Sequence, residues 1–288
     1  SQINAISKWL DADYLNQWVN GYETASSSKT IAIIMAGNIP LVGFHDFLSV
    51  LISGHKALIK MSSDDQHLLP MIVDLWRHSH PEMVGQIEFA KGKLASFDGV
   101  IATGSNNSAR YFEQYFGSYP HIIRKNRTSV ALLTGQESEE EMKQLGDDIF
   151  KYFGLGCRNV TKILVPEDYD LDHFFKGVFA HSSIIEHHKY SNNYDYYKAL
   201  WLMNKEDLLD NGFLLLKEEN DALVSPIGTL FYQRYKNREE MDDLLSRRSE
   251  EIQCVVSQGN TPFGQAQAPT LSDYADGVDT MKWLSKLS

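Results

Sequence analysis

The feature that most constrains the fold is an alternation of short apolar runs with helical patterns between Lys29 and Cys157. The apolar runs predict β-strands at residues 30–35, 57–61, 86–90, 98–103 and 129–133. Between them, apolar residues recur at three- and four-residue spacing, which predicts helices at residues 42–51, 67–76, 108–116 and 140–153. This rhythm is typical of βαβ units, so we predict an α/β fold with a parallel sheet covered by helices on both faces.

After Cys157 the rhythm continues less regularly. Further strands are predicted at residues 161–165, 213–216, 229–235 and 252–256. They favour a second α/β lobe that begins near residue 136. The stretch KYSNNYDYY at residues 189–197 is polar and aromatic without a clear period. We therefore expect an irregular segment there that lines or covers something.

Several classes of function are disfavoured by the composition. The formal net charge of -11 repels a phosphate backbone, so nucleic acid is not an expected partner. The apolar run at residues 41–52 is interrupted by His45 and Asp46 and is shorter than the roughly 20 residues of a membrane-spanning helix. Because the chain opens without a basic and then apolar signal, we expect a cytoplasmic protein. Two cysteines do not complete a tetrahedral zinc site, so no metal is expected.

Cys157 is the first candidate for chemistry. It lies in the sequence Gly154-Leu155-Gly156-Cys157-Arg158-Asn159, between a predicted helix and a predicted strand. Glycines let a backbone approach a ligand closely, and Arg158 favours the thiolate form of the neighbouring thiol. A buried structural cysteine in a glycine-rich turn explains this stretch equally well.

Three further motifs follow predicted strands. Asn38 lies in the turn MAGNIP, Lys60 closes the apolar strand of ALIK, and Gly104 and Ser105 form the turn of IATGS before a helix. The carboxyl ends of parallel strands are where ligands of open α/β sheets bind. Each motif also has a plain structural reading, because Asn and Ser are common turn and helix-start residues and strand-end lysines are usually solvated. The dinucleotide fingerprint G-x-G-x-x-G does not occur in the sequence.

In their order and spacing, the four motifs resemble those of the aldehyde dehydrogenase superfamily. The longer strings GNIPLVGFHDFL, FDGVIATGSNNSARYF, IIRKNR and YFGLGCRN are similar to the acyl-CoA reductase family, the LuxC-like long-chain fatty acyl reductases. The resemblance implies an aldehyde dehydrogenase-like fold. In that fold residues 1–135 form a Rossmann-type cofactor-binding lobe, residues 136–257 form the catalytic lobe, and residues 258–288 return to the first lobe and help to complete it.

The resemblance also assigns roles to two catalytic residues. Cys157 becomes the nucleophile that accepts the acyl group. The side-chain amide of Asn38 becomes an oxyanion donor beside the backbone N–H of Cys157. This assignment is chemically reasonable, because a thiolate that attacks a thioester carbonyl generates an oxyanion, which preorganised N–H donors stabilise.

The cofactor-binding residues are carried over in the same way. Lys60 and Ser63 correspond to the adenosine ribose site, Gly104 and Ser105 to the pyrophosphate site, and Met35 to the nicotinamide side. Because Ser63 replaces the carboxylate of many NAD-specific members, NADPH is the expected cofactor, with NADH as the alternative. The family's water-activating glutamate is absent near residues 121–124 and its cofactor-ribose glutamate is absent around residues 222–226.

The resemblance therefore predicts an NADPH-dependent enzyme that reduces a fatty acyl thioester, carried on CoA or on a protein, to an aldehyde through an acyl-cysteine intermediate. A homo-oligomer is expected. Two alternatives stay open, namely thiol-dependent aldehyde oxidation on the same residues and a non-catalytic subunit that holds an acyl group. The 37 residues before Asn38 are few for the superfamily, so we expect an N-terminal portion or loops to lie outside this sequence.

Other residues have structural interpretations. Cys254 alternates with the apolar residues of a predicted strand, which indicates a core position. Glu186, His187 and His188, with His181 nearby, lack the spacing of the H-E-x-x-H zinc motif and are interpreted as a structural or solvated cluster. The acidic run at residues 137–141 is expected to open a helix, where carboxylates complement the helix dipole.

Overall fold

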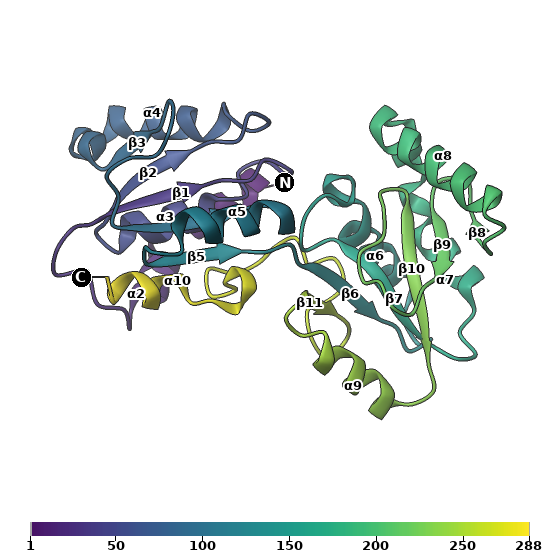
Figure 1. The fold of residues 1–288 in the computed structure, drawn as a ribbon. Helices are drawn as coiled ribbons and strands as arrows, with labels where there is room; N and C mark the ends of the chain where they lie inside the picture. Colours follow the sequence, from purple (N-terminus) through teal and green to yellow (C-terminus); the bar gives the residue numbers. More distant parts are fainter. Residues whose placement is uncertain (1, 288) are drawn as a thin grey trace. The chain divides into compact units, whose positions relative to one another are not determined.

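The computed structural model describes residues 2–287 of the chain. They divide into two compact α/β units (Figure 1). The first unit extends to Asn126 and includes the chain from Pro269 onward, and the second unit is Arg127–Ala268. The predicted lobe boundaries lie near residues 135 and 258, whereas the observed units change after Asn126 and after Ala268. The first boundary differs because the strand predicted at 129–133 belongs to the second sheet.

The first unit is built on a parallel sheet with the strand order β3-β2-β1-β4-β5. Its strands are β1 (Thr30–Ile34), β2 (Lys56–Lys60), β3 (Ile87–Phe89), β4 (Gly99–Thr103) and β5 (His121–Arg124). Its helices are α1 (Gln2–Trp9), α2 (Ala12–Val19), α3 (Phe44–Ile52), α4 (Leu68–Ser79), α5 (Asn106–Phe116) and α10 (Thr280–Ser285), with short 3-10 turns at Pro81–Gly85 and Ala275–Gly277. The strand order reverses between β1 and β4, which is the usual ligand-binding position of such a sheet.

Side chains of β1 alternate between the two faces of this sheet. Ile31 and Ile33 pack with Phe44 and Phe47 of α3, whereas Ala32 belongs to a second cluster that receives aromatic side chains of α5. Both faces of the sheet are therefore covered, as expected for a parallel sheet with crossover helices. This part of the fold agrees with the α/β prediction.

The second unit contains another mainly parallel sheet, with the order β11-β6-β7-β10-β9-β8 and only the β8–β9 pair antiparallel within residues 2–287. Its strands are β6 (Thr128–Leu132), β7 (Val160–Pro166), β8 (Leu209–Asp210), β9 (Leu215–Glu218), β10 (Thr229–Tyr235) and β11 (Ile252–Val256). Its helices are α6 (Glu139–Phe150), α7 (Leu171–Val178), α8 (His188–Met203) and α9 (Arg238–Arg247), with 3-10 segments at Lys151–Gly154 and Phe179–Glu186.

The expectation of an irregular segment at residues 189–197 is wrong, because these residues lie within helix α8. Tyr190, Tyr194 and Trp201 are its buried residues, four and seven positions apart, and they face the sheet. Large polar-tipped aromatics form this buried face, so a pattern based on aliphatic residues did not reveal the helical period. The acidic run behaves as predicted, since Ser138 caps α6 and forms a capping box with Glu141.

The final part of the chain packs into the first unit. The Trp9 indole N–H donates to the carbonyl of Pro269 at 2.9 Å, and a ring nitrogen of His45 lies 2.9 Å from the carbonyl of Leu271. Within residues 2–287, no helix combines the length and the apolar character needed to cross a membrane.

Candidate active site

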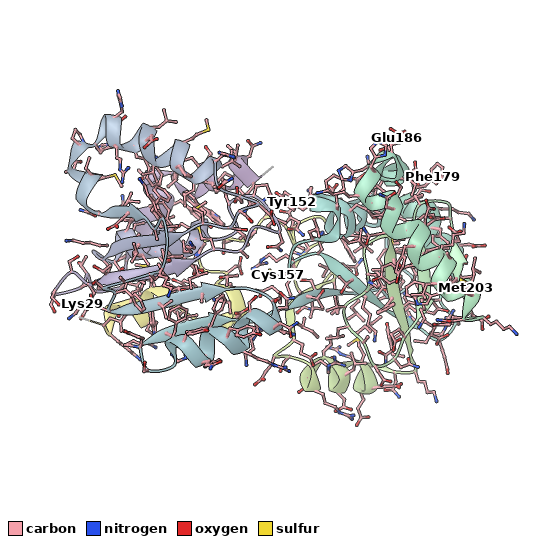
Figure 2. The ribbon with its side chains drawn as sticks, turned by 45° about the horizontal axis from the view of Figure 1, so that its top comes forward. Lys29, Tyr152, Cys157, Phe179, Glu186 and Met203 are labelled. Atoms are coloured by element: carbon pink, nitrogen blue, oxygen red, sulfur yellow. The ribbon has the colours of Figure 1, made fainter. Side chains whose placement is uncertain are left out.

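Cys157 lies on the connection between α6 and β7, which we call the cysteine loop (residues 151–159; Figure 2). Three consecutive residues of this loop have left-handed backbone angles: Tyr152 (φ 53°), Phe153 (φ 58°) and Gly154 (φ 77°). Left-handed angles are unfavourable for the two aromatic residues and persist only where the surroundings enforce them. The cysteine loop is therefore held in one unusual conformation.

Asn159 supplies much of this restraint. Its side chain is fully buried, and its amide oxygen accepts a 2.8 Å hydrogen bond from the backbone N–H of Gly156. Its amide nitrogen lies 3.1 Å from the carbonyls of Asp148 and Ile149 and 2.8 Å from that of Lys151. One side chain thus joins the end of α6 to the residue before Cys157.

The two thiols have different surroundings. Both are partly buried, and the backbone carbonyl of Cys157 accepts a 3.2 Å hydrogen bond from the Ser129 hydroxyl. The same hydroxyl lies 3.0 Å from the sulfur of Cys254, which packs against the second unit's core. Burial raises the pKa of the Cys254 thiol, so it is protonated near neutral pH and is a poor nucleophile. The structural interpretation of Cys254 fits this environment, although its side chain is only partly buried.

The structure brings the other predicted residues to one edge of the first sheet. β2, β1 and β4 are adjacent and parallel, so their carboxyl ends meet there. Met35 and Asn38 follow β1. Lys60 is the last residue of β2, and Ser63 follows it. Gly104 and Ser105 follow β4. Met35 is buried, Lys60 and Gly104 are partly buried, and Asn38, Ser63 and Ser105 are exposed.

Local contacts explain how these turns are formed. The turn after β1 packs on the turn after β2, since a Cβ at Gly37 would overlap the Ser62 side chain and the Leu41 N–H donates to Asp65 at 2.6 Å. Ser105 caps α5 by accepting from the Ser108 N–H at 3.2 Å. Ser105 thus has the helix-start role expected of it, whereas Lys60, expected to be solvated, is partly buried and donates to the Gly92 carbonyl at 3.0 Å.

Cys157 belongs to the second unit, whereas every other predicted site residue belongs to the first. The cooperation of Asn38 with Cys157 at one catalytic centre therefore stays a prediction.

Two histidines of the group that includes Glu186 pack on aromatic rings. His181 stacks on Phe150, and His187 stacks on Phe153. Among residues 2–287, no group of three or more His, Cys, Asp or Glu side chains is placed to hold a metal ion.

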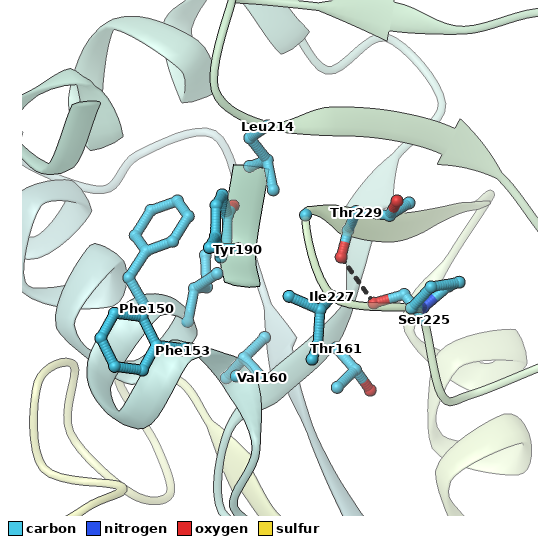
Figure 3. Close-up of a pocket in the computed structure, with 13 residues that line it drawn as sticks. Phe150, Phe153, Val160, Thr161, Tyr190, Leu214, Ser225, Ile227 and Thr229 are labelled. Atoms are coloured by element: carbon cyan, nitrogen blue, oxygen red, sulfur yellow. Dashed lines mark hydrogen bonds between the residues drawn. The ribbon is translucent and has the colours of Figure 1, made fainter. Parts of the chain in front are cut away.

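A small pocket of about 20 Å³ lies near the cysteine loop, between α6, α8 and the β9–β10 region (Figure 3). Phe150, Val160, Tyr190 and Ile227 line it together with Thr229, whose buried hydroxyl has no hydrogen-bond partner among the described residues. This volume is about that of one water molecule and is far too small for an acyl chain.

Sequence reasoning missed three polar residues that shape the site. Asn159 belongs to the YFGLGCRN string but was given no role, and Ser129 was predicted only as part of a strand. Buried Asp148 accepts hydrogen bonds from the N–H groups of Gly264 (2.6 Å) and Ala266 (3.0 Å), and burial raises its pKa to about 6. The sequence around Asp148 is rich in charged residues and gave no signal that this carboxylate is buried.

Solved structures with a similar fold include aldehyde dehydrogenases. An indole-3-acetaldehyde dehydrogenase from P. syringae, in complex with NAD+ and IAA, is 14% identical over 75% of this chain and 53% of its own, with a TM-score of 0.62. The Mycobacterium tuberculosis aldehyde dehydrogenase complexed with NAD+ is 16% identical over 83% and 60% of the two chains, with a TM-score of 0.58. The putative aldehyde dehydrogenase PutA from Anabaena variabilis is 13% identical over 84% and 64%, with a TM-score of 0.64.

These likenesses confirm the predicted α/β, aldehyde dehydrogenase-like fold. The chain spans about 53–64% of the length of such structures. No curated protein sequence matches it. The family model for acyl-CoA reductase (LuxC) matches residues 3–176, a range that includes every predicted site residue from Met35 to Cys157. The chain therefore belongs to the acyl-CoA reductase (LuxC) family, as its motifs predicted.

Proposed function

We propose that the chain is an oxidoreductase that reduces a fatty acyl thioester, carried on CoA or on a carrier protein, to an aldehyde with NADPH. The observation that carries this proposal is the restrained cysteine loop, which presents Cys157 within the matched family region. Cys254 is the only other cysteine of the sequence, and its raised pKa disfavours it as the nucleophile. The first unit would hold the cofactor and the second would hold the acyl group.

In the proposed reaction the Cys157 thiolate attacks the thioester carbonyl carbon. A new S–C bond forms, the electron pair moves to the oxygen, and the side-chain amide of Asn38 and the backbone N–H of Cys157 stabilise the oxyanion. The tetrahedral species collapses, the bond to the carrier sulfur breaks, and the carrier leaves as a thiolate that takes a proton from solvent. After reduction, the Cys157–carbon bond breaks, and the aldehyde and the thiolate are released.

The residues at the carboxyl edge of the first sheet fit a dinucleotide. α5 has no acidic residue in its first turn and is capped by exposed Ser105, so its N-terminus favours an anionic pyrophosphate. Lys60 adds a positive charge at the end of β2, which lies two strands from β4, and its ammonium donates to the Gly92 carbonyl at 3.0 Å. When bound, NADPH supplies the hydride that reduces the acyl carbonyl. The preference for NADPH over NADH rests on Ser63, which places no carboxylate against a 2'-phosphate.

The test is a panel of acyl-CoA thioesters with NADPH or NADH, in which cofactor oxidation and aldehyde formation are followed together. We expect aldehyde in proportion to oxidised cofactor and a higher kcat/KM with NADPH. Asn38→Ala should slow acylation by about a hundredfold with little change in cofactor affinity, as loss of one oxyanion donor does elsewhere. Acyl labelling without cofactor binding would indicate a non-catalytic acyl-holding subunit, and conversion only in the oxidative direction would indicate an aldehyde dehydrogenase.

Oligomeric state and substrate carrier also belong to the proposal. We propose that the protein acts as a homo-oligomer, which light scattering after gel filtration would measure. A carrier-protein thioester that is reduced faster than the CoA ester of the same chain length would identify the protein-bound acyl group as the preferred substrate.

A further inference from the structure

Asn159 forms hydrogen bonds to two parts of the backbone, the end of α6 and Gly156, the residue before Cys157. The last carbonyls of a helix lack partners within the helix and need other donors. At the end of α6 the carbonyls of Asp148, Ile149 and Lys151 lie within 2.8–3.1 Å of the Asn159 amide nitrogen. The side chain thus caps a helix that ends nine residues before it in the sequence. The left-handed turn at residues 152–154 reverses the chain between them.

The same residue holds both polar groups of the Gly156 backbone. The Gly156 N–H donates to the Asn159 side-chain oxygen at 2.8 Å, and the Gly156 carbonyl accepts from the Asn159 backbone N–H at 3.0 Å. A trans peptide is planar, so its carbonyl and the following N–H point in opposite directions. Fixing the Gly156 carbonyl therefore fixes the direction of the Cys157 N–H and the starting point of the Cys157 side chain.

Asn159 is itself held firmly in place. Its backbone carbonyl accepts hydrogen bonds from the Ser129 N–H at 3.2 Å and from the Thr128 hydroxyl at 3.4 Å, both on the neighbouring strand β6. Ser129 then donates through its hydroxyl to the Cys157 carbonyl at 3.2 Å. The sheet therefore supports the cysteine loop through Asn159 on one side of Cys157 and through Ser129 at Cys157 itself.

We propose that Asn159 is a positioning residue for acyl transfer, which aims the backbone N–H and the thiol of Cys157 at the thioester carbonyl. This inference rests on the proposed function of Cys157. The role requires an amide. An oxygen must face the Gly156 N–H while a nitrogen faces three carbonyl oxygens, and Asn is the smallest side chain that carries both. A carboxylate of the same shape would place an anionic oxygen against those carbonyls.

The decisive variant is Asn159→Asp, with Asn211→Asp as its matched control. The Asn211 oxygen accepts from the N–H groups of Phe213 (3.2 Å) and Leu214 (2.9 Å), and its amide nitrogen has no partner among the described residues. Asn211→Asp therefore keeps both contacts that the Asn211 oxygen accepts. Asn159→Asp, the same chemical change, removes the N–H donor that faces the three carbonyls. Both residues lie in the second unit.

Two rates are measured on each folded variant: single-turnover acylation by an acyl-CoA, and alkylation of Cys157 by iodoacetamide. Acylation develops an oxyanion and alkylation does not. We expect Asn159→Asp to slow acylation by about a hundredfold, the effect of a lost oxyanion donor, and to change alkylation by only a few-fold. Asn211→Asp should leave both rates unchanged.

Equal slowing of both rates, or acylation that is preserved with only a lower melting temperature, would overturn the inference. If Asn159→Asp does not fold, Asn159→Ser is measured with the same two rates and should show the same selective loss. Failure of both variants to fold would assign Asn159 to stability alone. If the unchanged protein is alkylated but never acylated, the proposed function fails instead, so the two failures are distinguishable.

Discussion

The buried ion pair between Asp46 and Arg124 makes the sharpest stability prediction. The two side chains are 8% and 4% exposed, and two guanidinium nitrogens of Arg124 contact the carboxylate at 3.1 and 2.6 Å. Arg124 also donates to the Ala275 carbonyl at 2.6 Å and to the Thr280 hydroxyl at 2.9 Å. The pair therefore joins α3 and β5 to the final part of the chain.

Asp46→Asn removes the negative charge closest to the buried Arg124 guanidinium and leaves the more distant Asp276 carboxylate, at 3.9 Å, as a counterion. Removing one partner of a buried pair typically costs about 3–5 kcal/mol, because the remaining charge is poorly solvated. We expect a loss of this size in the free energy of unfolding. Burial alone would raise the pKa of Asp46, but Arg124 outweighs burial and the pKa is lowered. The contribution of the pair is therefore present above the normal Asp pKa and is lost as the pH falls through the lower folded-state value.

Urea unfolding at neutral pH measures the change, and Asp74→Asn is the control. Asp74 pairs with Arg77 at 3.7 Å on the surface of α4, with a side chain that is 75% exposed, so its loss should cost less than about 1 kcal/mol. Replacing both buried partners, as in Asp46→Leu with Arg124→Met, should recover part of the loss. A cost for Asp46→Asn as small as that of the control would refute the reasoning.

Two further predictions concern α6. Burial raises the pKa of Asp148 to about 6, so the folded state binds this proton more tightly than the unfolded chain, and stability should fall by about 2–3 kcal/mol as the pH rises from 4 to 7. Asp148→Asn should flatten that slope in unfolding measurements, and an unchanged slope would contradict the assignment. A Cβ at Gly146 would overlap the His181 ring, so Gly146→Ala should cost about 1–3 kcal/mol despite the helical preference of alanine. In a His181→Ala background the same change should become stabilising, as thermal melting would show.

Much of the fold followed from local patterns in the sequence. The strands β1, β2 and β4 were predicted because short apolar runs alternate with helical periods, and that alternation implies a parallel sheet. The assignment of β6 to the second sheet was not predictable, because a strand pattern does not reveal its partner. Helix α8 was missed since its buried face consists of Tyr190, Tyr194 and Trp201 rather than aliphatic residues.

The candidate site was predictable to a different extent. Cys157 is a candidate because of its motif, and the turns after β1, β2 and β4 are candidates because they follow strands at one edge of the sheet. The role of Asn159 was hidden, because its contacts reach back to residues 148–151 and to Gly156 through three-dimensional packing. The ion pair of Asp46 with Arg124 was equally hidden, since its partners are 78 residues apart.

The most direct test of the central claim is to locate the acyl group on the protein. The chain is incubated with an isotopically labelled acyl-CoA without cofactor, digested and mapped by mass spectrometry, and a second sample receives NADPH before digestion. We predict one acyl adduct, on the peptide that contains Cys157, and its loss with release of an equal amount of aldehyde when NADPH is added. An adduct on Cys254, or discharge of the Cys157 adduct as free acid, would contradict the account.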